Sequence, residues 1–124
     1  MLLILELELS RLRKPFIVVK FVSKSDLLGF CVGDKDSAEI TISKTDPQDG
    51  RKLGFCEMMR TLAHEMVHAK QFLRGELTSE SSWIWKGRNA NGYSYENQPW
   101  EREAYRLENP LYLNCLPVFL AFNN

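Results

Sequence analysis

Residues 61–76 of the chain read TLAHEMVHAKQFLRGE and contain its two histidines, His64 and His68. They belong to a longer segment in which apolar residues recur mostly at intervals of three and four. This spacing is typical of an amphipathic helix and predicts one over about residues 55–74, ended by Gly75. The apolar positions that define this helix are Phe55, Met58, Met59, Leu62, Met66, Ala69 and Leu73.

The two histidines are spaced as metal ligands. Residues four apart lie on the same face of a helix, so the imidazoles of His64 and His68 can converge on one metal ion. Histidine nitrogens bind Zn²⁺ at about 2.0–2.1 Å. Glu65 can then take a proton from a water held by the metal, and we predict it to be the general base. The alternative is a pair of ordinary helix histidines, with Glu65 as a surface charge.

A third protein ligand is expected from a second helix. Catalytic zinc sites usually have three protein ligands and a water. A helix over about residues 99–108 is predicted to begin at Pro99 and to end before Pro110. Its apolar face comprises Trp100, Ala104, Leu107 and Leu111, and its carboxylates are Glu101, Glu103 and Glu108.

Among these carboxylates Glu103 is the expected ligand, because it lies beside the apolar face. A carboxylate on an inward face needs a compensating charge, which a zinc ion supplies. Glu101 is the alternative, although a first-turn carboxylate can also serve the free N–H groups of the helix.

Strand patterns dominate the first 43 residues. LLILELELS, residues 2–10, alternates apolar and acidic positions, and residues 15–23 form a β-branched run expected to complete a hairpin with it. Further strands are expected at residues 30–32 and 38–43, with later candidates in SSWIWKG and GYSY. The predicted fold class is α+β. A small, mostly antiparallel sheet of residues 1–43 would pack on both helices in a single domain of residues 1–124.

Composition narrows the possible partners. The chain has 16 basic and 16 acidic side chains, so it shows no charge excess of the kind that binds nucleic acid or membranes. Its cysteines, Cys31, Cys56 and Cys115, are odd in number and widely spaced, which favours reduced thiols over disulfides. The N-terminus has neither a basic leader nor a cleavage site, and LNCLPVFLAF is too short to span a membrane. A cytoplasmic protein without a nucleic-acid or membrane partner is expected.

With AHEMVH on a helix and PWEREA about 35 residues later, residues 38–108 resemble the zincin metallopeptidases, in particular small glutamate-liganded forms and SprT-like domains. The resemblance implies His64 and His68 as zinc ligands, Glu65 as general base and a downstream glutamate as third ligand. It also implies that the strand AEITIS, residues 38–43, lies along the cleft and pairs with an extended peptide. The chain also resembles short proteins of bacteriophage genomes, and this resemblance implies a standalone domain in the cytoplasm of a bacterial or phage-infected cell. The third histidine of metzincins is absent, which favours a narrow substrate range.

These features together predict a zinc-dependent peptidase that acts on a peptide or protein. The alternative is a zinc-binding interaction module without turnover, although such a module has no use for Glu65. A DNA-associated protease is disfavoured by the neutral charge. Candidates for stabilising the oxyanion are Tyr93, Tyr95, Arg102 and Tyr105, which could equally be packing residues. Core packing is the simplest role for Trp83, Trp85 and Trp100.

Overall fold

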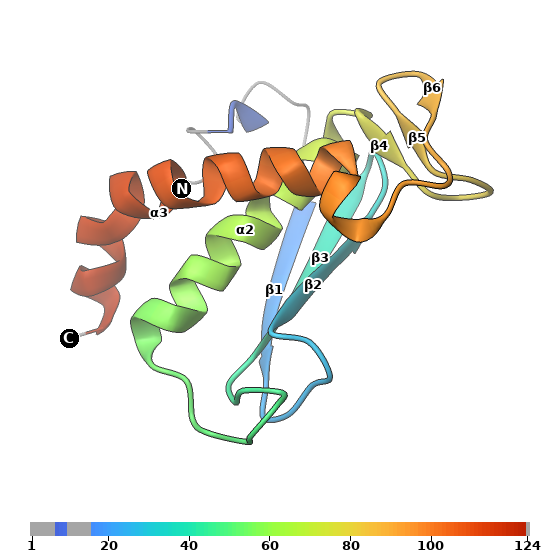
Figure 1. The fold of residues 1–124 in the computed structure, drawn as a ribbon. Coiled ribbons are helices and arrows are strands. Elements are labelled where there is room, and N and C mark those ends of the chain that lie inside the picture. Colours follow the sequence, from blue (N-terminus) through green and yellow to red (C-terminus); the bar gives the residue numbers. More distant parts are fainter. Residues whose placement is uncertain (1–6, 10–15, 124) are drawn as a thin grey trace.

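The computed structural model describes residues 7–9 and 16–123 and has the expected α+β class. One sheet contains β1 (Phe16–Val22), β2 (Gly29–Gly33) and β3 (Ser37–Ser43). The helix α2 (Phe55–Leu73) lies between this sheet and α3 (Pro99–Asn123), as Figure 1 shows. A second small sheet and a short 3₁₀ helix connect α2 to α3: β4 (Leu77–Thr78), β5 (Ile84–Trp85), β6 (Arg88–Asn89) and η2 (Tyr95–Asn97).

The sequence predicted a mostly antiparallel sheet, but the sheet that the structure describes is mixed. Its strand order is β1-β3-β2, with β1 parallel and β2 antiparallel to β3. β3 takes the central position because its inward side chains are the most completely buried of the sheet, with Ile40 and Ile42 fully inaccessible. The predicted strand of residues 2–10 falls partly outside the described residues, and its residues 7–9 form a turn and a single 3₁₀ position. The hairpin expected between it and β1 lies largely outside the described residues, among which β1 pairs with β3.

The predicted helix over residues 55–74 is confirmed as α2. At its N-terminus the Glu57 carboxylate accepts a hydrogen bond from the Gly54 N–H, 3.3 Å away, which satisfies a free backbone donor. At its C-terminus the chain reverses through Gly75, whose φ of +70° favours glycine. One side of α2 packs on the sheet and the other on α3, and its C-terminal half, residues 65–73, is buried throughout.

The second helix is longer than predicted. It continues from Pro99 through Pro110 and Pro117 to Asn123. Each internal proline removes one backbone hydrogen bond, but Leu111, Tyr112 and Cys115 are buried in the main core beyond the first proline. This burial keeps the chain helical where local propensity would end it.

The segment between the helices contains one of the two predicted strands. Residues 84–85 of SSWIWKG form β5, which pairs with β4 and β6. GYSY is not a strand, because residues 92–94 are turn or irregular and Tyr95 begins η2. This segment brings aromatic side chains over the C-terminal half of α2.

Candidate metal centre

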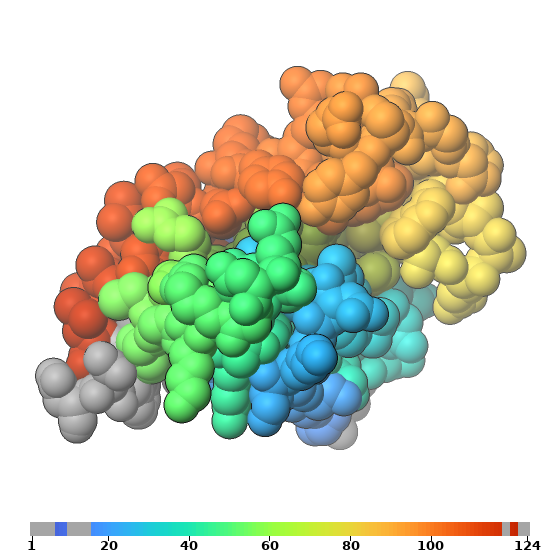
Figure 2. Space-filling model, turned by 60° about the horizontal axis from the view of Figure 1, so that its bottom comes forward, coloured from blue at the N-terminus to red at the C-terminus, as the bar shows by residue number. Residues whose placement is uncertain are grey.

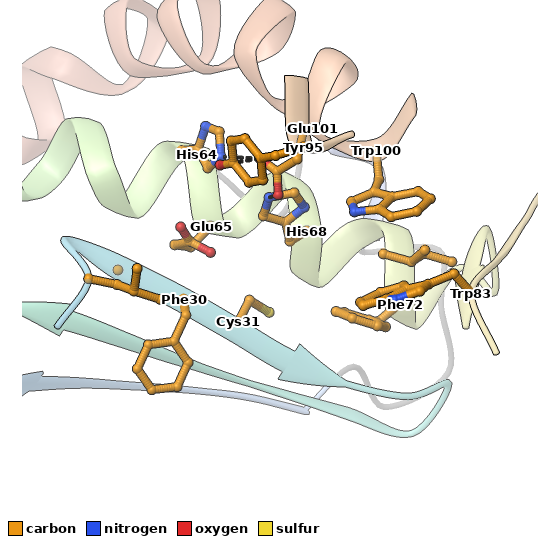
Figure 3. A pocket seen from close by; sticks show the side chains of 13 residues that line it. Phe30, Cys31, His64, Glu65, His68, Phe72, Trp83, Tyr95, Trp100 and Glu101 are labelled. Carbon is orange, nitrogen blue, oxygen red and sulfur yellow. Dashed lines mark hydrogen bonds and ion pairs between the residues drawn. The ribbon is translucent and has the colours of Figure 1, made fainter. Parts of the chain in front are cut away.

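Three side chains converge where α3 crosses α2. Nε2 of His64 lies 3.1 Å from Oε1 of Glu101, and Nε2 of His68 lies 3.0 Å from Oε2 of the same carboxylate. One ligand atom from each residue lies within 4.8 Å of the others. All three side chains are largely buried. Figure 3 shows them gathered at one point between α2 and α3. This His64, His68 and Glu101 group could hold a metal ion.

Glu103, the expected third ligand, is not part of this group. Its carboxylate accepts hydrogen bonds from Lys70 Nζ at 2.8 Å and Gln71 Nε2 at 3.0 Å, one turn further along α2. The alternative, Glu101, is the carboxylate that meets the histidines. Glu101 shares a helix face with Ala104 and Glu108, at spacings of three and four, and this face crosses His64. That spacing is visible in the sequence, but the rotation of α3 about its axis is not.

A second set of contacts orients both imidazoles. Nδ1 of His64 lies 2.9 Å from Oε1 of Glu108, and Nδ1 of His68 lies 2.8 Å from Oε1 of Gln71. Both partners are acceptors at these atoms, so each Nδ1 carries the proton and each Nε2 keeps its lone pair for a metal. The sequence pattern assigns no role to Gln71, and it offers Glu108 only as a possible metal ligand.

The orientation of the Gln71 amide follows from its other neighbours. Its Nε2 donates to the backbone carbonyl of Trp100 and to Glu103, both at 3.0 Å. A carbonyl oxygen and a carboxylate can only accept, so the amide nitrogen must face them and the amide oxygen must face His68. Lys70 pairs with Glu103 at 2.8 Å and so favours the ionised form of this carboxylate, which accepts from the Gln71 amide. Glu103 therefore acts on His68 through Gln71.

The electrostatics of the group are those of a cation site. Burial disfavours the charged form of His64, but hydrogen bonds to Glu101 and Glu108 outweigh it and raise its pKa to about 9. Burial likewise disfavours ionised Glu101, yet hydrogen bonds from both histidines lower its pKa to about 2. Positive charge is thus strongly favoured between these side chains, and a metal ion can supply it in place of protons.

The spacing of the donors also fits a small metal ion. Ligand atoms at about 2.05 Å from a tetrahedral zinc are about 3.3 Å apart. The distances from the histidine Nε2 atoms to Glu101, 3.1 Å to Oε1 and 3.0 Å to Oε2, are close to this value, and one ligand atom of each residue lies within 4.8 Å of the others. Two imidazole nitrogens and one carboxylate oxygen are a donor set that a metal ion such as zinc accepts.

Glu65 lies beside this group and points toward the sheet rather than toward Glu101 (Figure 3). It is only 6% exposed, and no residue in the described part of the chain gives its carboxylate a hydrogen bond or an ion pair. Burial raises the pKa of this carboxyl, and the two histidines oppose that shift without cancelling it. A buried carboxylate with free lone pairs and a raised pKa is suited to accept a proton.

The group opens into a cleft. One cavity, of about 260 Å³, is lined by His64, Glu65 and His68, and a second, of about 350 Å³, shares His64 and Glu65 with it. The space-filling view shows a hollow between the blue residues around β2 and the orange residues that lead into α3 (Figure 2). A ligand in the cleft would therefore lie against both histidines and Glu65.

The four oxyanion candidates occupy different places. Tyr95 lines both cavities, and its hydroxyl donates to Glu101 Oε1 at 3.0 Å. Tyr105 lies 3.3 Å from the Tyr95 hydroxyl and has its ring against His64. Tyr93 and Arg102 line a separate cavity and are not brought to the histidines. Tyr95 is thus the candidate whose hydroxyl bonds directly to a residue of the metal group.

The strand beside the cleft is β2, not β3 as the resemblance implied. β3 is hydrogen-bonded on both edges and has no edge for a peptide. Bonds such as Ser43 N–H to Leu28 O, at 2.9 Å, fix the alternation along β2. The backbone groups of Gly29, Cys31 and Gly33 consequently point away from β3, toward the edge of β2 that no described strand pairs, here called its free edge. Gly29 and Cys31 also line the cleft.

The cysteines do not take part in the metal group. The structure places Cys31, Cys56 and Cys115 in no disulfide, in agreement with the prediction of reduced thiols. Burial raises the pKa of Cys31, so this thiol at the floor of the cleft stays protonated at neutral pH.

Comparison of the chain with protein-family models, curated proteins and solved structures gave no match in any of the three. Among the described helices, none has the length and apolar character needed to cross a membrane.

Proposed function

We propose that the protein is a zinc-dependent peptidase. The observation that carries this proposal is the unpartnered Glu65 carboxylate, buried in the cleft directly beside the three convergent donors. A metal site that only stabilises a fold would close its coordination sphere and would not need this carboxylate. The donor set of two imidazoles and one carboxylate favours zinc over the harder ions Mg²⁺ and Ca²⁺.

The zinc would be held by Nε2 of His64, Nε2 of His68 and the Glu101 carboxylate. When bound, such an ion polarises a carbonyl group and lowers the pKa of a water toward about 7. Glu65 would accept a proton from the attacking water and return it to the leaving amine nitrogen, so that one water adds across the peptide bond. Tyr95 would hold Glu101 in place through its hydroxyl, which also faces the cleft.

A peptide substrate would lie along the free edge of β2. The outward N–H and C=O groups of Gly29, Cys31 and Gly33 offer an extended chain the hydrogen bonds of an added strand. Because Gly29 and Cys31 border the same cavity as Glu65, a strand added there would carry its backbone past the metal group. This arrangement favours an unfolded or extended segment as substrate, which is in keeping with a narrow substrate range.

The test pairs metal analysis with a peptide-library digest. Purified protein should contain about one zinc per chain, and Glu65→Gln should keep the zinc while its cleavage rate falls by at least about 10³-fold, since the general base is lost. Glu80→Gln, a change at an exposed glutamate outside the cleft, should behave as wild type. Zinc in both proteins without cleavage by either would indicate a metal-stabilised binding module instead of a peptidase.

A further inference from the structure

Large apolar side chains gather at one end of the cleft. Phe72, Leu77, Trp83 and Trp100, here called the aromatic pocket, line the 260 Å³ cavity together with the metal group. They come from α2, β4, the loop before β5 and α3. Figure 3 shows three of them, Phe72, Trp83 and Trp100, on the side of His68 away from Glu65.

Trp83 is the exposed member of this pocket. Phe72, Leu77 and Trp100 are 5%, 2% and 3% exposed, whereas Trp83 is 39% exposed. Its ring stacks on Trp100 with centroids 5.0 Å apart and an angle of 16° between the planes. Its backbone is fixed by bonds to Asn91 and Ala90, at 3.0 and 2.8 Å. An apolar surface is therefore held in place at the cleft, and it is free to be covered by a ligand.

The cavity at the other end of the cleft differs in its charged side chains. The 350 Å³ cavity beyond Glu65 is lined by Arg60, Thr61, Tyr105 and Glu108, and also by Leu27 and Leu28. Arg60 and Glu108 bring charge to this cavity, whereas the aromatic pocket has no charged residue. The metal group and Glu65 lie between the two.

We propose that the aromatic pocket binds a bulky apolar side chain of the substrate, next to the bond that is cut. This inference rests on the proposed peptidase function and adds the substrate class. The cavity that holds the pocket, at 260 Å³, is smaller than the roughly 300–1,000 Å³ of sites for drug-sized ligands, so it suits one side chain.

An apolar side chain is favoured over a charged one because of what the pocket offers. Its four defining residues carry no charge, and the charged groups of the cavity are those of the metal centre and Glu65. A lysine or glutamate side chain placed against Trp83 would lose its water without gaining a partner. A phenylalanine or leucine side chain would cover Trp83 and be stabilised in proportion to the apolar area removed from water.

The experiment uses N-acetyl amino-acid hydroxamates that differ only in the side chain, titrated against the zinc-loaded full chain by calorimetry. The hydroxamate anchors each probe on the metal, and its side chain samples the adjacent surface. The phenylalanine and leucine probes should bind roughly 10- to 100-fold more tightly than the alanine probe. Trp83→Ala should weaken the phenylalanine probe by roughly 10-fold and the alanine probe by less than about two-fold.

Trp85→Ala is the matched control. Trp85 comes from the same hairpin and also faces Trp100, at 6.3 Å between centroids, but it lines a different cavity. Its loss should leave the side-chain preference unchanged. Trp83→Phe, which keeps an aromatic ring, replaces Trp83→Ala if that variant does not fold, and should retain a reduced preference.

Two results would overturn the proposed role of the aromatic pocket while leaving the metal centre intact. One is equal binding of all probes, and the other is an equal loss of side-chain preference in the Trp83 and Trp85 variants. Failure of every probe to bind zinc-loaded protein would contradict the metal centre, and the pocket that rests on it would fall as well. The two failures are therefore distinguishable.

Discussion

Two glutamates separated by one residue have different tasks at the start of α3. Glu101 reaches both histidines, and Glu103 reaches Lys70 and Gln71. Each carboxylate is largely buried, so each needs the positive or hydrogen-bonding partners that it has. Replacing either glutamate should leave its partners without a carboxylate, but only the loss of Glu101 should remove a metal ligand.

We expect Glu101→Ala to lower zinc affinity by at least about 100-fold, because one of three protein ligands is gone. Glu103→Ala should still bind about one zinc per chain, with affinity reduced by no more than about 10-fold, since Gln71 keeps its bond to the Trp100 carbonyl. Competition with a chromophoric chelator measures both affinities. Equal loss in the two variants would show that Glu101 is not the ligand.

At the scale of elements, α2 and its ligand spacing could be predicted because periodicity and the His64–His68 interval are local properties of the chain. The choice of Glu101 over Glu103 as third ligand could not be predicted, because it depends on how α3 is rotated about its axis against α2. The parallel pairing of β1 with β3 and the passage of α3 through Pro110 are also decided by burial between distant segments. Local patterns indicate where elements begin, but not which of their faces meet.

The contact between β2 and α2 depends on a glycine. A Cβ added at Gly29 would lie 2.6 Å from Cγ2 of Thr61 and 3.3 Å from Cγ of Glu65. We expect Gly29→Ala to destabilise the fold by about 1–3 kcal/mol, because β2 and α2 must move apart. It should also slow cleavage by displacing Glu65. Urea unfolding and the cleavage rate measure the two effects.

Thr61→Ser removes the methyl group that would clash and provides the matched rescue. By itself it should change stability little, because Thr61 lies on the partly exposed side of α2. Combined with Gly29→Ala it should recover part of the lost stability, with the contacts to the Thr41 carbonyl oxygen, at 3.2 Å, and to Glu65 still tight. A double variant no more stable than Gly29→Ala alone would refute the close approach as the cause.

At the scale of the whole molecule, a metal in this centre would tie the two long helices together. His64 and His68 lie on α2 and Glu101 on α3, so the donors converge only in the folded chain. A ligand that binds only the folded state at 100 times its dissociation constant stabilises it by about 2.7 kcal/mol. For a chain of 124 residues this corresponds to a rise in Tm of roughly 10 °C. In the wild type, the Tm measured with excess zinc should exceed the Tm measured with a chelator by this amount. Glu101→Ala keeps both histidines but loses the ligand on α3, so zinc should raise its Tm by only a few degrees. A rise as large as that of the wild type would show that the metal binds elsewhere.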